Sequence, residues 1–115
     1  MSSSVPEPAL DRPLALSRVG GDLELLREIA ALFLDECPRA LLEIHQAIAG
    51  EDAAKLENAA HSLKGSVANF GASAAVAAAL RLEQMGRSQQ LLEASETLRT
   101  LEQALSVVCA ELTAL

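Results

Sequence analysis

Apolar side chains recur every three or four residues between Asp22 and Gly50, and no other feature of the sequence constrains the fold as strongly. The series consists of Leu26, Ile29, Phe33, Cys37, Leu41, Ile44 and Ile48. This spacing places the series along one face of a helix. Asp22 is a good N-cap for it, and Gly50 suits the position after its last turn. Pro38 interrupts the pattern without changing its phase, which predicts a kink or a helix–helix junction near Cys37 but no change of direction.

N-cap residues and glycines divide the rest of the chain into three further helices. Asp52 is a candidate N-cap for a helix over residues 53–69. An alanine-rich helix is expected over residues 72–85, ended by Gly86, and a last helix over about residues 88–112. In the last helix, two apolar positions repeat in steps of seven and form a heptad seam. The seam comprises Leu91, Leu98, Leu105 and Leu112, interleaved with Ala94, Leu101, Val108 and Leu115.

The composition favours an all-α fold. Half of the 115 residues are hydrophobic, yet there is no Trp or Tyr and there are two Phe, so Ala and Leu supply most of the apolar mass. Both are strong helix formers, and the β-branched and aromatic runs typical of strands are missing. Four amphipathic helices with short connections predict a mostly antiparallel four-helix bundle.

Residues 1–13 have the composition of a linker. They contain three of the four prolines and three consecutive serines, which predicts a flexible lead-in. The domain itself is expected to span residues 14–115, because a chain of this length holds one core and not two. Within it, residues 14–19 are expected to form a short turn or helix that covers one end of the core. Linkers of this kind also join the modules of longer proteins.

Charge and hydropathy exclude several classes of function. The formal net charge of −7 and the scarcity of aromatic residues argue against a nucleic-acid-binding surface. No apolar run approaches the roughly 18 residues that span a bilayer, and the N-terminus lacks a basic-then-apolar signal. We therefore expect a cytoplasmic protein whose domain makes no membrane contact. Cys37 and Cys109 lack metal-ligand spacing and are expected to be reduced, buried thiols, and no metal site is expected.

One histidine stands out in the segment AAHSLKGSVANFG, residues 59–71. The apolar face of this helix is formed by Leu56, Ala59, Ala60, Leu63, Val67 and Phe70. His61 lies roughly 160° around the helix from Leu63, so it points to solvent and cannot be a core histidine. An ordinary surface histidine remains the alternative. Against it, Gly65 lies one turn away, where Ala would be favoured by about 1 kcal/mol, and Lys64 adds a neighbouring cation.

This arrangement suits the transfer of an anionic group to the ring. A neutral imidazole nitrogen is a nucleophile that can form a covalent intermediate. Phosphoryl transfer requires in-line access and neutralisation of the phosphoryl oxygens. The small Gly65 provides the access, and Lys64 provides part of the charge. Because a phosphoramidate bond is labile, the ring could pass the group on to another acceptor.

The segment HSLKG resembles the H-x-x-K-G signature of histidine-containing phosphotransfer (HPt) domains, the relay modules of multistep two-component signalling. The likeness extends to GGDLELLREIAALFLDECPRAL with its proline, to SVANFGA at the end of the histidine helix, and to LRLEQMGR in the next helix. It covers about residues 14–112, which is nearly the whole chain.

The resemblance implies a role for each residue of this segment. His61 would accept phosphate on Nε2, with Lys64 near the phosphoryl oxygens and Gly65 leaving room for the partner's active site. Glu83 falls where the family places a Gln or Glu that bonds the other ring nitrogen and fixes the tautomer. An i,i+4 salt bridge from Glu83 to Arg87 is an equal alternative. Arg87 matches a basic residue near the site in some members, and a solvated helix-end cation is its alternative.

The remaining polar residues receive weaker interpretations. Glu57 and Asn58 are expected to be solvated residues that touch a partner. Ala68, two turns beyond His61, is also expected to face the partner. His45 is interpreted as a histidine on the flank of the apolar stripe, and Asn69 as an ordinary residue near a helix end.

As a whole, the resemblance implies a phosphorelay intermediate. It would accept a phosphoryl group from the aspartate of a response-regulator receiver domain and pass it to another receiver. Mg²⁺ would belong to the receiver, and this chain would hold no cofactor. The sequence has no Gly-rich phosphate loop, so the chain would be a phosphotransfer module and not an enzyme with its own ATP site.

Two other functions are compatible with four amphipathic helices. One is a helical-bundle adaptor without phosphochemistry. The other is the phosphoacceptor module of a chemotaxis-type or hybrid sensor histidine kinase. If the chain is instead a separate protein, a hybrid sensor histidine kinase is a further candidate partner. The dimerisation domain of a sensor kinase is disfavoured by Ser62 and by the absence of a proline shortly after His61. The heptad seam is compatible with a monomer, in which it packs internally, and with a dimer.

Overall fold

The structure, a computed structural model, describes residues 9–115, and within them the chain forms five α-helices and no β-strand. The helices are α1 (Arg12–Arg18), α2 (Leu23–Ala49), α3 (Ala53–Ala68), α4 (Ser73–Ser88) and α5 (Ala94–Thr113). The prediction of an all-α fold is therefore confirmed, although the number of helices is five. No helix in the described part of the chain is long and apolar enough to cross a membrane.

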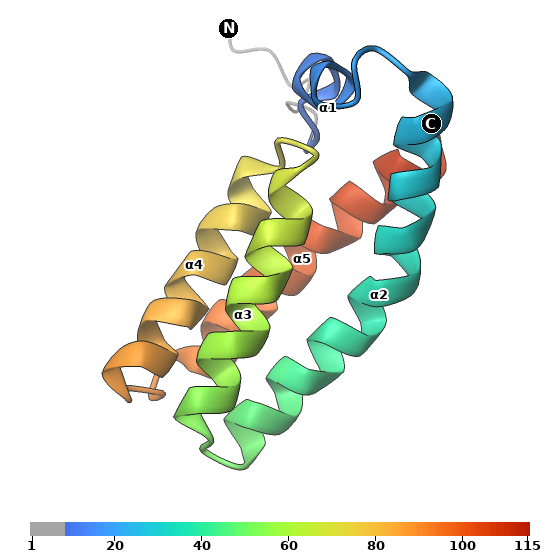
Figure 1. Ribbon diagram of the computed structural model, residues 1–115. Helices are drawn as coiled ribbons and strands as arrows, with labels where there is room; N and C mark the ends of the chain where they lie inside the picture. The colour runs from blue at the N-terminus through green and yellow to red at the C-terminus, as the bar shows by residue number, and fades with distance from the viewer. Residues whose placement is uncertain (1–8) are drawn as a thin grey trace, which may run out of the picture.

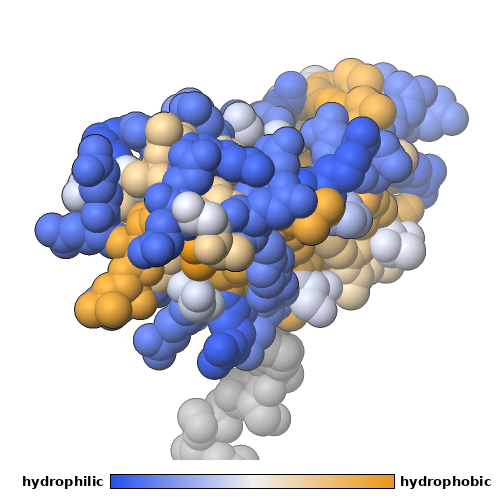
Figure 2. All heavy atoms as spheres, turned by 90° about the horizontal axis from the view of Figure 1, so that it is seen from below, coloured by the Kyte–Doolittle hydropathy of each residue, from blue (hydrophilic) through white to orange (hydrophobic). Residues whose placement is uncertain are grey.

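The four long helices pack side by side, and α1 lies across one end of them (Figure 1). Helix α3 packs between α2 and α4, and α5 contacts both α2 and α4, so that the four enclose a common core. The connections between consecutive long helices lie at alternating ends of the molecule (Figure 1). Figure 2 views the end that holds the α2–α3 and α4–α5 connections, where hydrophilic residues cover much of the surface and apolar residues show between them.

The segment before α2 is more closely tied to the core than its composition indicated. Helix α1 begins at Arg12, two residues before the expected segment, because the carboxylate of Asp11 accepts a hydrogen bond from Leu14 N at 3.1 Å and caps it. The amides of Ala9 and Leu10 each donate to the Glu111 carboxylate of α5 at 2.9 Å. Part of the predicted lead-in thus contacts the domain, whereas its residues 1–8 lie outside the described part of the chain.

Helix α2 runs without interruption through Pro38. Asp22 caps its start and Gly50 follows its end, both as predicted. A proline inside a helix removes one backbone hydrogen bond and clashes with the carbonyl four residues earlier, which bends the helix. Figure 1 shows α2 bending near its middle. Of the two alternatives, the kink agrees with the structure, and the prediction of a helix–helix junction near Cys37 is wrong.

The end of α4 differs from the prediction. The helix does not stop before Gly86 but continues to Ser88, and Gln89 ends it in the left-handed conformation with φ 58°. Gly86 is buried against α3, where a Cβ atom would lie 2.6 Å from Glu57 N and 2.7 Å from Ala53 O. Its role is therefore close packing of two helix backbones. Helix α5 accordingly begins at Ala94, six residues after the expected start at about residue 88.

The core consists of the apolar stripes that the sequence predicted. All six residues predicted for the apolar face of the histidine helix are buried, five of them on α3 and Phe70 just after its end. Phe70 packs edge to face on Phe33 of α2, with ring centroids 5.5 Å apart. Six residues of the heptad seam are buried: Ala94, Leu98, Leu101, Leu105, Val108 and Leu112. Leu91 and Leu115, at the two ends of the seam, are partly buried. The seam is thus used inside the chain's own core.

The two cysteines are free, and they differ in burial. Cys37 of α2 is buried as predicted, and burial raises the pKa of its thiol to about 12. Cys109 of α5 is half-buried, so the prediction of two buried thiols is wrong for this residue. Both border a groove between α2 and α5 next to Pro38.

The packing at Gly86 generates a prediction that separates two helical glycines. Gly86→Ala should destabilise the fold by roughly 1–3 kcal/mol, because the new methyl group would meet the backbone of α3. Gly65→Ala is the matched control: a Cβ there would have no heavy atom within 4 Å, so the better helix propensity of Ala should stabilise the fold by about 1 kcal/mol. Urea denaturation followed by circular dichroism measures both changes. Equal effects of the two substitutions would contradict the close contact.

Candidate functional site

His61 lies on the solvent-facing side of α3, next to α4. Its side chain is 67 % exposed, which confirms the orientation predicted from the helix periodicity. Nδ1 of the ring lies 3.1 Å from Oε2 of Glu83 on α4. Because a carboxylate can only accept a hydrogen bond, Nδ1 carries the proton and donates it. The other nitrogen, Nε2, is hydrogen-bonded to no described residue and holds its lone pair toward solvent.

The carboxylate of Glu83 is the centre of a charged cluster between α3 and α4. The residue is 3 % exposed, and three side chains converge on it. Besides the ring of His61, Lys64 Nζ lies 2.6 Å from Oε1 and Arg87 Nη2 lies 2.9 Å from Oε2. The contact with Lys64 is the main cause that lowers the pKa of Glu83, the bond from His61 acts in the same direction, and burial opposes both. Glu83 is therefore an ionised, buried carboxylate.

The geometry answers the question about Glu83 that the sequence left open. Its hydrogen bond with His61 and its i,i+4 salt bridge with Arg87 were treated as alternatives. Both are present, and they share the same oxygen, Oε2.

Arg87 bridges the two helices. Its Nε donates to Oε2 of Glu57 on α3 at 3.0 Å, while Nη2 donates to Glu83. The bond with Glu57 is the main cause that raises the pKa of the guanidinium. The interpretation of Arg87 as a merely solvated helix-end cation is therefore wrong. Glu57, which the sequence predicts to be a solvated residue that touches a partner, is half-buried and accepts this bond from Arg87, and its contact with a partner stays a prediction.

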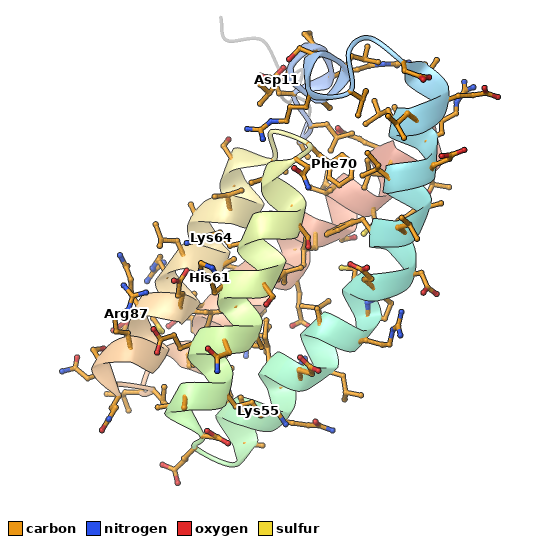
Figure 3. All side chains as sticks on the ribbon, in the orientation of Figure 1. Asp11, Lys55, His61, Lys64, Phe70 and Arg87 are labelled. Atoms are coloured by element: carbon orange, nitrogen blue, oxygen red, sulfur yellow. The ribbon has the colours of Figure 1, made fainter. Side chains whose placement is uncertain are left out.

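The surface beside His61 is open. Figure 3 shows His61, Lys64 and Arg87 along the side where α3 meets α4. Gly65 is exposed, and a Cβ placed on it would have open space around it. Besides Glu57, two more residues are expected to face a partner: Asn58, which is exposed, and Ala68, which is half-buried. The surface next to His61 is therefore free of side-chain bulk at Gly65.

His45 belongs to a different face of the molecule. It lies on α2, where its Nε2 is 3.1 Å from Oε2 of Glu102 on α5, and its side chain is 54 % exposed. The structure thus leaves it outside the cluster on α3 and α4, in agreement with the interpretation as a flank histidine. Asn69 is exposed and forms the C-cap of α3. Within residues 9–115, no group of three or more His, Cys, Asp and Glu side chains is placed to hold a metal ion.

Sequence reasoning missed two contacts of the site: the ion pair between Lys64 and Glu83, and the bridge from Arg87 to Glu57. A signal for both is present in the sequence. Glu57, His61 and Lys64 are spaced by four and three residues on one side of a helix, and Glu83 and Arg87 are spaced by four on the next. Reading these rows as facing each other across the interface would have paired their charges.

The sequence of residues 28–111 matches the Hpt domain family. Among solved structures, the fold is similar to that of histidine-containing phosphotransfer protein B (HptB) from Pseudomonas aeruginosa PAO1, with a TM-score of 0.87 and 24 % sequence identity over 95 % of each chain. No match was found among curated proteins.

The charged cluster generates a prediction for the titration of Glu83. A lowered carboxyl pKa means that the ionised form stabilises the fold above the ordinary value of 4.5, and that this contribution is lost as the pH falls through the lower, folded-state pKa. Glu83 should therefore remain ionised at pH 4.5, and Lys64→Gln should raise its pKa. Titration of the Glu83 carboxyl carbon by ¹³C NMR measures both.

The matched control is Lys55→Gln on the same helix, because Lys55 Nζ bonds Gln46 of α2 instead (Figure 3). This substitution should leave the titration of Glu83 unchanged. A Glu83 titration that is insensitive to Lys64→Gln would contradict the assigned cause.

Proposed function

Because the chain belongs to the Hpt domain family, whose members are histidine phosphotransfer modules of two-component signalling, we propose that His61 is its phosphoacceptor. In this proposal the chain is a phosphorelay intermediate. His61 takes a phosphoryl group from the aspartyl phosphate of a response-regulator receiver domain and passes it to the aspartate of another receiver. The observation that carries the assignment is the bond from Nδ1 to Glu83, which leaves Nε2 as an exposed nucleophile.

The transfer step is a displacement at phosphorus. The lone pair of Nε2 attacks the phosphorus atom in line with the bond to the receiver's aspartate. The N–P bond forms as that P–O bond breaks, and the aspartate leaves as a carboxylate. Nε2 has no proton to lose, and Nδ1 keeps its proton, so the phosphorylated ring gains positive charge. The buried carboxylate of Glu83 lies 3.1 Å from Nδ1 and stabilises this charge.

Lys64 and Gly65 serve the same step in different ways. The ammonium group of Lys64 is one helical turn from His61 and supplies positive charge for the phosphoryl oxygens. Gly65 leaves the space through which the receiver's active site reaches Nε2. Mg²⁺ in this proposal is provided by the receiver. The phosphoryl donor is an aspartyl phosphate rather than ATP.

We further infer how the fold presents this site. Hpt domains interact with receiver domains and with kinases. The four long helices act as an antiparallel bundle that holds α3 and α4 rigidly side by side, and α1 covers the end of the core away from the α2–α3 connection. The receiver docks over His61, Gly65 and Ala68, with Asn58 at the edge of the contact. The two free cysteines support a reducing compartment, the cytoplasm, for the reaction.

The proposal predicts that phosphoryl transfer depends on His61 and not on His45. A receiver carrying labelled phosphate on its aspartate, with Mg²⁺, should label the wild-type protein with an acid-labile, alkali-stable bond. His61→Gln should abolish the label, because the nucleophile is removed. The matched control His45→Gln should retain it, because His45 faces α5 and not α4. Label on the His61 variant would move the site elsewhere, and no label on any protein across a panel of receivers would favour an adaptor.

A second prediction concerns the open surface at Gly65. Gly65→Gln places a side chain where the partner approaches, so transfer from the receiver should slow on the order of 10²-fold. Phosphorylation by the small donor phosphoramidate should change much less, because that molecule needs less room. Phosphoryl incorporation over time measures both rates. Equal losses with both donors would contradict a role in partner access.

A further inference from the structure

Lys64 is held by Glu83 before any phosphoryl group is present. Its side chain is only 25 % exposed, and its Nζ lies 2.6 Å from Oε1. A phosphoryl group on Nε2 would add roughly 1.5 to 2 negative charges one helical turn away. The flexible stem of a lysine lets its point charge move between two nearby anions. Lys64 therefore has two competing partners, Glu83 and the phosphoryl group.

Movement of Lys64 would expose a problem at Glu83. Among the described residues, Lys64 is the ionic contact of Oε1, and this buried oxygen is otherwise without a hydrogen-bond partner. A buried carboxylate that loses its counter-ion becomes costly and tends to take up a proton. A protonated Glu83 could donate its own O–H to Nδ1 as well as accept from it, so it would no longer fix the proton on Nδ1 of His61. The ring of His61 becomes positively charged only as the bond to phosphorus forms, so until then a cation other than Lys64 must hold the charge on Glu83.

Arg87 is placed to do this. Its Nη2 bonds Oε2 of Glu83, the oxygen that also accepts from His61, and its Nε bonds Glu57. Two carboxylates on different helices therefore fix the planar guanidinium from two sides, and arginine keeps its charge at all physiological pH values. These two bonds hold the guanidinium against both carboxylates, so Arg87 is less free than Lys64 to move toward a phosphoryl group. The geometry thus favours a fixed arginine and a mobile lysine.

We propose that Arg87, anchored by Glu57, is a positioning residue that keeps the Glu83 carboxylate on Nδ1 of His61 while Lys64 exchanges Glu83 for the phosphoryl group. The exchange rests on the proposed function of His61. The positioning does not, because it concerns the proton of the unphosphorylated ring. Before phosphorylation the two carboxylates and two cations of the cluster balance. Afterwards Lys64 and the positively charged ring offset the charge of the phosphoryl group, while Arg87 remains on Glu83.

The experiment compares Arg87→Gln with Arg81→Gln, an exposed arginine of the same helix. The first readout is the tautomer of His61, from the ¹⁵N shifts of the neutral ring by NMR. Arg87→Gln should convert a ring protonated at Nδ1 into a mixture of tautomers, because Oε2 of Glu83 loses the bond that holds it at Nδ1 while Lys64 contacts only Oε1. Arg81→Gln should not change the tautomer. The second readout is transfer from a phosphorylated receiver, which Arg87→Gln should slow about 10-fold because less of the ring presents a free Nε2.

Two further comparisons test the parts of the proposal separately. Glu57→Gln should act in the same direction as Arg87→Gln, and the double variant should be no worse than Arg87→Gln alone, because both act through one guanidinium. Lys64→Gln should leave Nδ1 protonated because Arg87 remains, whereas Lys64→Gln with Arg87→Gln should not. Arg87→Lys keeps the positive charge but cannot span both carboxylates, so its ring tautomer and its transfer rate should lie between those of the wild type and Arg87→Gln.

The outcomes are distinguishable. An unchanged tautomer in Arg87→Gln would overturn the proposal, even if transfer is slower, because Arg87 would then act on the phosphoryl group or the partner. A fixed tautomer in the double variant with Lys64 would overturn it as well. If the wild type accepts no phosphoryl group from any receiver, the proposed function fails, while the tautomer measurements still decide the role of Arg87. Circular dichroism verifies that each variant is folded.

Discussion

The carboxylate of Glu83 is buried between two helices, and the positions of the surrounding charges follow from it. A buried carboxylate without partners costs several kcal/mol, so the fold has to surround it with donors. Lys64 and His61 reach it from α3, and Arg87 reaches it along α4. Each of these contacts also has a consequence for the exposed ring. The bond to Nδ1 fixes the tautomer, the contact with Lys64 holds that cation one helical turn from the ring, and Arg87 ties the carboxylate to Glu57.

The charges of this cluster explain how a protein with a net charge of −7 can present a site for a phosphoryl group. Glu57 and Glu83 balance Lys64 and Arg87, so the surroundings of His61 are close to neutral although the chain as a whole is acidic. A neutral cluster attracts an anion less than a basic one would. A neutral cluster also holds the phosphoryl group less tightly, which suits a module that both accepts this group and releases it.

Much of the fold could be predicted from the sequence, since periodicity and N-caps reveal which face of each helix is buried and where it begins. The exposure of His61, the buried face of α3 and the space at Gly65 follow from one helix alone. Of the contacts of Glu83, the i,i+4 pair with Arg87 follows from α4 alone, and the resemblance implied the bond with His61. The ion pair with Lys64 was missed because it depends on the rotation and offset of α4 relative to α3. The predicted end of α4 was wrong for a related reason. Gly86 was interpreted as a helix terminator, although its small size is required by the close contact with α3.

The contact at Gly86 has a consequence for how such a site diverges. The residues that carry charge can be exchanged for others of similar chemistry, and compensating changes on the facing helix can follow them. A position where two backbones touch has no equivalent substitute, because every other side chain begins with the carbon atom that does not fit. Gly86 is therefore hard to replace although it takes no part in the chemistry of the site. A substitution of Gly86 would look like a defect in signalling, although the cause would be a changed distance between α3 and α4.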